Sequence, residues 1–246
     1  MRPALRPLLR ATAFAGLVMI SACLDAASET ECGPDALGVS RTLMLTPESP
    51  PPYELLKRGE VILTFDDGPA WHRTKRVMKE LSKECTQATF FLQGNKAEAW
   101  PGIAKSIREA GHTVGSHSWD HANLADLPLE EAVANALHGQ AAVSAAIGED
   151  TPLFRFPFIA TTPELSEAIK AEGLIDVTVT VDGADWTGIT PEDSVAQILT
   201  MLEQHNRRGM VLLHDPFSRS AWRTRLLLQS LKSEGYRVVA LEQPGN

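Results

Sequence analysis

The stretch Val61-Ile62-Leu63-Thr64-Phe65-Asp66-Asp67-Gly68-Pro69 decides the fold. Its first five residues form a short apolar run with two β-branched residues at its start, which is typical of a buried strand. The run stops at two carboxylates followed by Gly and Pro, which are turn residues. Neighbouring side chains of a strand point to opposite faces, so the two carboxylates can take separate roles. On its own, however, this segment is better explained as an ordinary turn.

Strand and helix patterns alternate from Glu60 to the end of the chain. The predicted strands cover residues 61–65, 88–92, 112–116, 153–157, 175–181, 210–213 and 236–241. The predicted helices cover residues 72–84, 101–111, 128–148, 163–173, 194–205 and 221–234. Such alternation implies parallel strands that are joined by right-handed crossovers. Either a doubly wound sheet or a small, irregular barrel fits this order.

Ionisable residues at the strand ends distinguish these two folds. They lie in or directly after five of the predicted strands and are Asp66, Asp67, His117, His121, Arg155, Asp185 and His214. A barrel gathers the carboxyl ends of all its strands at one mouth, whereas an open sheet concentrates its site near one switch point. The sequence therefore predicts an α/β barrel with its site at the carboxyl end of the strands.

Each polar feature also has an ordinary explanation when it is taken alone. His117 and His121 are spaced i, i+4, which can place two imidazoles on one face for a metal, but this spacing often occurs by chance. Arg155 in an apolar strand requires a partner for its charge. Asp185 and His214 follow apolar segments, where a carboxylate can fix the tautomer of a histidine and raise its pKa.

Taken together and in order, these segments closely resemble the five motifs of the polysaccharide deacetylase family. This family carries the NodB homology domain and is also called the family 4 carbohydrate esterases. The segments are Thr64–Pro69, His117–His121, Arg155–Phe158, Asp182–Trp186 and Leu212–His214. The resemblance implies a single catalytic domain with a distorted (β/α)₇ barrel. It also implies a divalent-metal hydrolase that removes acetyl groups from glycans.

The resemblance assigns a role to each motif residue. Asp67, His117 and His121 correspond to the ligands of one divalent metal ion, with Zn²⁺ expected ahead of Co²⁺ or Ni²⁺. Asp66 corresponds to the general base, paired with Arg155. His214 corresponds to the general acid, oriented by Asp185. The backbone N–H of Phe158 corresponds to the oxyanion donor. Trp186 and Leu212 correspond to the lining of the acetyl pocket.

One position departs from the family pattern. The third motif usually ends in Tyr, and here it ends in Phe158, followed by Ile159-Ala160-Thr161 where Gly is more usual. The oxyanion donor at this position is a backbone N–H, so Phe is compatible with activity. The missing hydroxyl changes what this position can offer a sugar, which leaves the substrate preference open.

The N-terminal segment has the features of an export signal. Residues 1–22 hold three Arg and no acid, followed by a mostly apolar stretch. Ile20-Ser21-Ala22-Cys23 resembles the bacterial lipoprotein box, in which Cys23 becomes lipidated. The alternative is an ordinary signal peptide that is cut after Ala27. We expect an exported protein, periplasmic or cell-surface, that touches a bacterial membrane only through this lipid.

Residues 23–57 lack a clear period and contain Pro50-Pro51-Pro52. They fit a Pro-containing tether that precedes a catalytic domain at 58–246, or equally a strap packed along that domain. After lipidation of Cys23, two cysteines remain, and an oxidising compartment favours a Cys32–Cys85 disulfide over two unpaired thiols.

The composition limits the partners. Of the residues, 43% are apolar and 22% charged, and the formal net charge is −8. A net-acidic chain lacks the basic surface that nucleic-acid binding requires. We expect a monomer that acts on an acetylated glycan, peptidoglycan- or chitin-like. An O-acetyl esterase of the xylan type, another small-amide hydrolase and an inactive glycan-binding relative are the alternatives.

Overall fold

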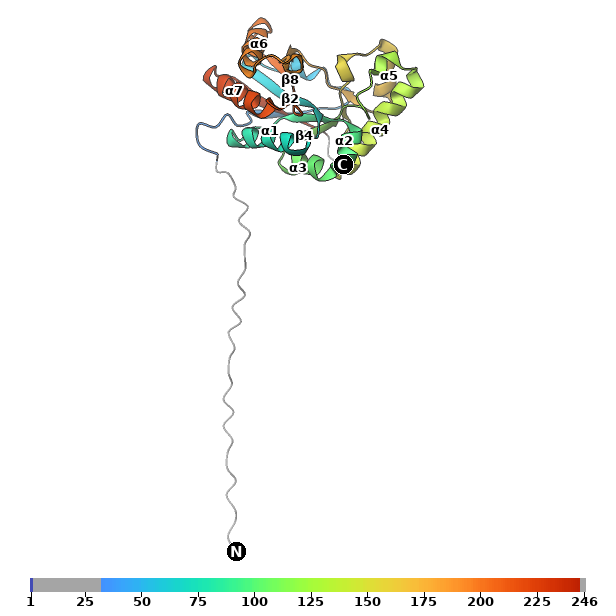
Figure 1. Ribbon diagram of the computed structural model, residues 1–246, viewed down its shortest axis with the longest axis horizontal. Coiled ribbons are helices and arrows are strands. Elements are labelled where there is room, and N and C mark those ends of the chain that lie inside the picture. Colours follow the sequence, from blue (N-terminus) through green and yellow to red (C-terminus); the bar gives the residue numbers. More distant parts are fainter. Residues whose placement is uncertain (2–31, 244–246) are drawn as a thin grey trace.

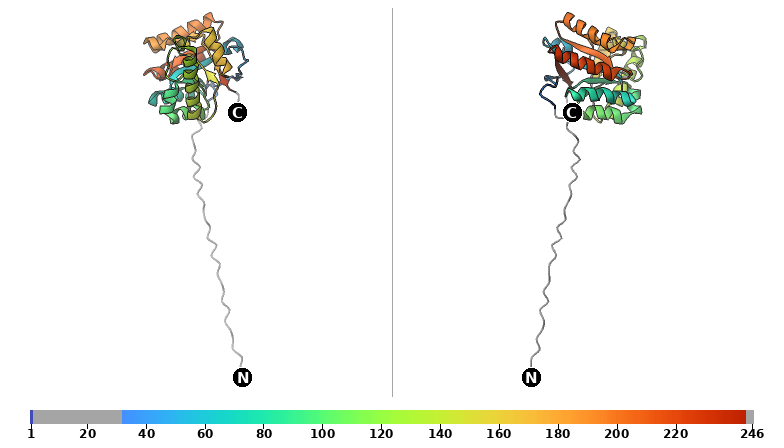
Figure 2. Two further views of the ribbon diagram at one scale, coloured as in Figure 1. Left: turned by 90° about the vertical axis from the view of Figure 1, so that its right-hand side faces the viewer. Right: turned by 60° about the vertical axis from the view of Figure 1, so that its left-hand side comes forward.

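The computed structural model describes Met1 and residues 32–243. Parallel strands form a curved sheet, and helices surround it on the outside (Figures 1 and 2). The strands are β1 (Arg41–Met44), β2 (Glu60–Gly68), β3 (Thr89–Leu92), β4 (Thr113–Ser116), β5 (Leu153–Phe154), β6 (Ile175–Asp176), β7 (Val181–Asp182), β8 (Gly209–His214) and β9 (Arg237–Glu242). The helices are α1 (Trp71–Lys83), α2 (Gly94–Ala99), α3 (Pro101–Glu109), α4 (Leu129–Ile147), α5 (Pro163–Ala171), α6 (Pro191–Gln204) and α7 (Ser220–Ser233). Short 3₁₀ turns lie at Pro52–Leu55, Leu124–Asp126, Pro157–Ile159 and Asp185–Thr187.

Hydrogen bonds join the barrel strands in the order β6-β5-β4-β3-β2-β8-β7, and every pairing is parallel. Within the described residues β6 and β7 are not paired, so the barrel is open there. The predicted distorted α/β barrel is confirmed. The register also places Asp66 at the end of β2 directly beside His214 at the end of β8.

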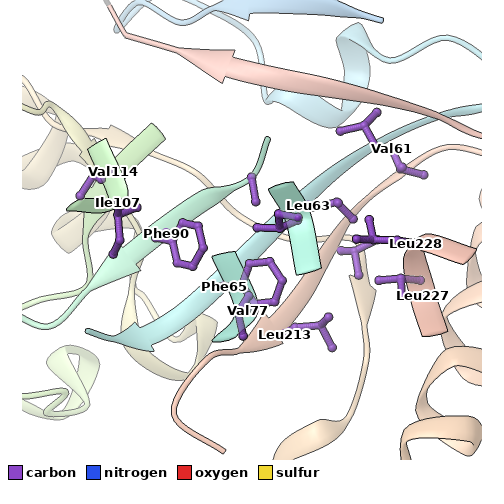
Figure 3. Close-up of a cluster of buried hydrophobic side chains, with 14 of the residues drawn as sticks. Val61, Leu63, Phe65, Val77, Phe90, Ile107, Val114, Leu213, Leu227 and Leu228 are labelled. Carbon is purple, nitrogen blue, oxygen red and sulfur yellow. The ribbon is translucent and has the colours of Figure 1, made fainter. Parts of the chain in front are cut away.

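The side-chain alternation of β2 separates two parts of the core. Val61, Leu63 and Phe65 point outward and pack with Val77 of α1 and Leu228 of α7 (Figure 3). The intervening residue Ile62 belongs to a second cluster inside the barrel. Because side chains alternate along a strand, Thr64 and Asp66 share the inward face of Ile62. The apolar outer face thus holds β2 in place while its inner face carries polar chemistry.

The fifth predicted strand, residues 175–181, is wrong as a continuous element. The structure divides it into β6 and β7. Between them, the carbonyls of Val177 and Thr178 accept hydrogen bonds from the Arg155 guanidinium at 2.7 and 3.5 Å. The demand of this buried cation for acceptors therefore interrupts the strand. The short helix α2 was not predicted as a separate element.

Residues 32–57 form a strap on the barrel rather than an extended tether. Their strand β1 pairs with β9, with Arg41 opposite Val239, and Leu45 and Leu56 are buried. Of the two alternatives, a tether and a packed strap, these residues adopt the strap, because their apolar side chains find a surface to cover. A disulfide joins Cys32 to Cys85 after α1, with 5.8 Å between the Cα atoms.

The signal segment, Cys23 and the rest of residues 2–31 lie outside the described residues. Among the helices that the structure does describe, none combines the length and the apolar character needed to span a membrane.

Helices α2 and α4 approach each other through two glycines. A Cβ built on Gly94 would lie 2.6 Å from the Cα of Gly139. A Cβ on Gly139 would lie 2.6 Å from the Trp119 N and closer still to the carbonyl group of Ser118. Backbone bonds from Gly94 and Asn95 to the Ser118 and Trp119 carbonyls, both 2.9 Å, complete this contact. The loop that carries His117 and His121 therefore rests directly on the backbone of α4.

We expect Gly139→Ala to lower the free energy of unfolding by about 1–3 kcal/mol, as overpacking of a tight site does. Urea denaturation followed by circular dichroism measures this. Gly102→Ala is the matched control, since it is also helical and its Cβ would have no neighbour within 4 Å. Equal midpoints for the two variants would contradict the close-packing argument.

Candidate active site

The carboxyl ends of the strands surround a cavity of about 450 Å³. Its wall contains eight of the ten site residues predicted within the barrel, together with Ile159 and Asp182. The eight are Asp66, Asp67, His117, His121, Phe158, Trp186, Leu212 and His214. Arg155 and Asp185, the other two, are buried and contact Asp66 and His214 respectively. The structure thus brings all ten together, while the disulfide of Cys32 and Cys85 lies outside this wall.

Arg155 lies inside the barrel with 0% of its surface exposed. Its Nη1 donates to Asp66 Oδ1 at 2.6 Å and to Thr64 Oγ1 at 2.8 Å. The face of the Phe91 ring covers the guanidinium, 4.0 Å from its centroid. Because a buried guanidinium requires a partner for its charge, Arg155 fixes the position of the Asp66 side chain at the edge of the cavity.

Asp67, His117 and His121 form a cluster with metal-ligand geometry. One potential ligand atom from each lies within 4.8 Å of the others. Asp67 Oδ1 is 3.2 Å from His121 Nε2 and 3.8 Å from His117 Nε2. The Nδ1 atom of His117 lies 2.8 Å from the Arg155 carbonyl, which fixes the tautomer that leaves Nε2 free as a ligand.

For two members of this cluster, His117 and Asp67, the pKa is shifted toward the deprotonated form that binds metals. Burial lowers the pKa of His117, against the charges of the nearby carboxylates. Burial by itself raises the pKa of Asp67, but the neighbouring histidines outweigh it, and the net shift is downward. One carboxylate oxygen and two imidazole nitrogens are the donor set of many catalytic zinc sites. The three residues therefore fit a divalent metal ion.

Several supporting residues carried no signal in the sequence. Gln93 donates to Asp67 Oδ1 at 2.8 Å, and Lys96 donates to the Asp67 carbonyl at 2.9 Å. Ser118 Oγ accepts from the His121 N–H at 3.1 Å, and Asn135 of α4 accepts from the Trp119 N–H at 3.0 Å. They come from α2 and the residue before it, from α4 and from the loop itself, so only the folded arrangement identifies them.

His214 forms a second charged pair on the other side of the cavity. Its Nδ1 lies 2.7 Å from Asp185 Oδ1, and its backbone N–H donates to Asp185 Oδ2 at 2.9 Å. Burial lowers the pKa of His214, but the hydrogen bond and charge of Asp185, with the charges of Asp66 and Asp67, raise it to about 9. His214 is thus an imidazolium at neutral pH that can donate a proton into the cavity.

The remaining predicted residues lie at the rim. Phe158 is 65% exposed, with its backbone at φ 59°, and its ring meets that of His121 edge-on at 4.5 Å. Within the described residues its N–H has no hydrogen-bond acceptor. Trp186 is 61% exposed and its Nε1 donates to Asp182 Oδ2 at 3.2 Å, while Leu212 is buried in the cavity wall.

Comparison with known proteins places this arrangement in a family. The family model described as polysaccharide deacetylase matches residues 55–177. A chitooligosaccharide deacetylase of Azorhizobium caulinodans is 30% identical over 193 residues, which cover 76% of this chain and 90% of that protein. The chain belongs to the polysaccharide deacetylase family. Members of this family of carbohydrate esterases depend on a metal, which agrees with the cluster of Asp67, His117 and His121.

Two further relatives are informative. The peptidoglycan-N-acetylglucosamine deacetylase PgdA of Listeria monocytogenes is 34% identical over 185 residues, or 74% of this chain. This chain spans only 38% of the length of that relative. The structure of the peptidoglycan deacetylase Bd3279 of Bdellovibrio bacteriovorus matches with a TM-score of 0.70 and 29% identity. That match covers 87% of this chain and 58% of the other.

We expect His121→Ala to reduce the bound metal to well below one ion per chain, because it removes one of three ligands. Elemental analysis after dialysis against buffer with trace Zn²⁺ measures the loss. His138→Ala is the matched control, since His138 stacks on Trp119 outside the cluster, with ring centroids 3.8 Å apart. Full metal content in the His121 variant would remove it from the ligand set.

Proposed function

We propose that this chain is a metal-dependent N-deacetylase of an extracytoplasmic polysaccharide or oligosaccharide, and that it releases acetate. One observation carries the proposal. A carboxylate held by Arg155 and an imidazolium held by Asp185 lie side by side at the ends of β2 and β8, and the metal-binding cluster lines the same cavity. Hydrolysis of an amide requires both a proton acceptor and a proton donor at neutral pH.

Asp67, His117 and His121 would hold the metal ion, with Zn²⁺ the expected species ahead of Co²⁺ or Ni²⁺. When bound, such an ion lowers the pKa of a coordinated water and polarises a carbonyl. Gln93 and the Arg155 carbonyl keep two of these ligands oriented. The side chains thus reach the site in their ligating geometry.

Asp66 acts as the general base. Its Oδ1 is engaged by Arg155, so Oδ2 remains to accept the proton of the attacking water. The ion pair with Arg155 keeps this side chain in place. As the water oxygen bonds to the acetyl carbon, negative charge develops on the carbonyl oxygen. The Phe158 N–H, which has no other acceptor within the described residues, can donate to that oxygen.

His214 completes the reaction as the general acid. The sugar nitrogen leaves poorly as an amide anion, and the proton of the His214 Nε2 turns it into a neutral amine. Asp185 binds Nδ1, which directs Nε2 into the cavity. Leu212 and Trp186 line the cavity beside His214, where they would receive the acetyl methyl group.

The relatives and the N-terminal sequence support the proposed substrate and location. The relatives named above are peptidoglycan and chitooligosaccharide deacetylases, which supports an acetylated glycan as the partner. The export signal and the lipoprotein-like Cys23 support a periplasmic or cell-surface monomer that touches the membrane only through its lipid.

Acetate release tests this function directly. Metal-loaded protein is incubated with N-acetylated peptidoglycan fragments, chitin oligosaccharides and O-acetylated xylan, and acetate is quantified. We expect release from at least one N-acetylated glycan, loss of release with a chelator, and recovery on addition of Zn²⁺. Release from the xylan alone, or equal release in excess chelator, would contradict a metal-dependent N-deacetylase.

The pH profile tests the role of His214. Because His214 must be protonated, kcat/KM should fall as the pH rises through its pKa. This fall is the alkaline limb of the pH profile. The pairing with Asp185 places it above the ordinary histidine pKa of about 6.5, up to the pKa of about 9 that His214 has without metal. A bound cation offsets the effect of Asp67 and moves the limb within this range.

We expect Asp185→Asn to move the alkaline limb to lower pH and to reduce kcat by about 10²–10⁴ when the imidazole is misoriented. Metal content serves as the control, because Asp185 is not in the ligand cluster. An unchanged limb with full metal content would show that another group controls the alkaline side.

A further inference from the structure

A second cavity of about 450 Å³ adjoins the active site. Trp186 belongs to the walls of both cavities, and Asp185, which lines the second one, contacts His214 in the wall of the first. Phe217 lines the second cavity, and its ring centroid is 5.6 Å from that of His214. The second cavity therefore begins beside the group that donates the proton to the leaving sugar. A sugar chain bound across His214 would pass directly over it.

Three arginines line this second cavity, although the chain as a whole is acidic. Arg73 is exposed, and its Nη1 donates to the Pro216 carbonyl. Arg219 is exposed, and its guanidinium makes no hydrogen bond or ion pair within the described residues. Burial lowers the pKa of the third arginine, Arg223, against the negative charges of two nearby carboxylates, Asp185 and Glu192. Asp185 is already bound by His214, which leaves positive charge in excess.

Arg223 shows that this charge is built into the fold. Its surface is only 2% exposed, and its Nη2 donates to the Ile189 carbonyl at 3.2 Å. Its Nε and Nη1 are buried without a hydrogen-bond partner in the described residues, and Nη1 is 3.7 Å from Asp185 Oδ2. A buried guanidinium with unused donors is costly unless charge is balanced nearby. An anion in the cavity would supply that balance.

The aromatic wall indicates what carries the anion. Trp186 and Phe217 are both exposed on the cavity wall. Exposed aromatic faces beside a glycan-processing site can stack on sugar rings, and arginine pairs with carboxylates through its planar fork. A sugar that bears a carboxylate satisfies both features, whereas a neutral sugar uses only the first.

We propose that this second cavity is an anionic subsite, and that it selects N-acetylated glycans whose neighbouring sugar bears a carboxylate. The inference rests on the proposed function, because it places the acetylated sugar at His214. It favours an acidic glycan over a neutral, chitin-like one. The carboxylate can be attached to the sugar through an ether or borne by a short peptide, and Arg219 is the residue free to bind either.

The test uses four tetrasaccharides of similar size. One is all N-acetylglucosamine. In the others N-acetylglucosamine alternates with N-acetylmuramic acid, whose lactyl group is a free carboxylate, a neutral carboxamide, or an amide-linked alanylalanine with its terminal carboxylate. Calorimetry on the full chain after chelation measures binding without turnover. Acetate release by metal-loaded protein gives kcat/KM. The free-acid and carboxamide forms differ only in charge.

We expect at least one carboxylate form to bind about threefold to tenfold more tightly than the carboxamide, as partly exposed ion pairs allow. Arg219→Gln should remove most of this preference and leave carboxamide binding unchanged. Raising the salt concentration should also reduce it. Arg225→Gln is the matched control, since Arg225 is exposed on α7, the helix that Arg219 directly precedes, but lies outside the cavity. The Arg225→Gln variant should keep the wild-type preference for the carboxylate form over the carboxamide form.

Two results would overturn the subsite. One is equal binding of the carboxylate and carboxamide forms to the wild type. The other is a preference that survives both Arg219→Gln and Arg73→Gln. The function and the subsite fail separately: acetate release without any charge preference removes the subsite alone, and a preference without acetate release removes the enzymatic function alone. The two carboxylate forms show which attachment the subsite accepts.

Discussion

The buried charge of Arg155 is the constraint on which the site depends. A guanidinium without solvent contact must find acceptors inside the barrel. It finds them in Asp66 and Thr64 of β2 and in the carbonyls of Val177 and Thr178 beyond β6. These bonds hold the base and interrupt the sheet between β6 and β7.

The same residue also reaches the metal-binding cluster, because its own carbonyl is bonded to His117 Nδ1. Arg155, which lies between β5 and the 3₁₀ turn Pro157–Ile159, thus orients the base through its side chain and a metal ligand through its backbone. Removing the Arg155 charge would leave Asp66 buried without its partner, so the base and the fold cannot be separated at this position.

Much of the site could be predicted from the sequence, because its residues follow apolar strands at short, regular spacing. Asp66 and Asp67 end a run whose burial is evident, and His214 ends another. Parallel strands bring such ends to one mouth whatever the details of packing. The prediction of one continuous strand over 175–181 was wrong, because a local pattern cannot show that a distant arginine donates hydrogen bonds to the carbonyls of this segment.

Other features depend on contacts between segments far apart in the chain. Nothing in the sequence distinguishes Gly94 or Gly139, and only the approach of α2 to α4 gives them a role. The strap 32–57 has too few apolar residues for a period, yet β9 offers it an edge to pair with. Arg223 is one of two arginines on α7, and burial alone distinguishes it from Arg225.

The register of β2 and β8 couples the two halves of the reaction. Asp66 and His214 are neighbours across the strands, and the negative charge of Asp66 contributes to the raised pKa of His214. When Asp66 accepts the proton of water, that charge disappears, and His214 becomes a stronger acid. This happens at the stage when the sugar nitrogen requires a proton. The Asp185 pair keeps His214 charged beforehand, whereas the loss of charge on Asp66 helps to release its proton afterwards.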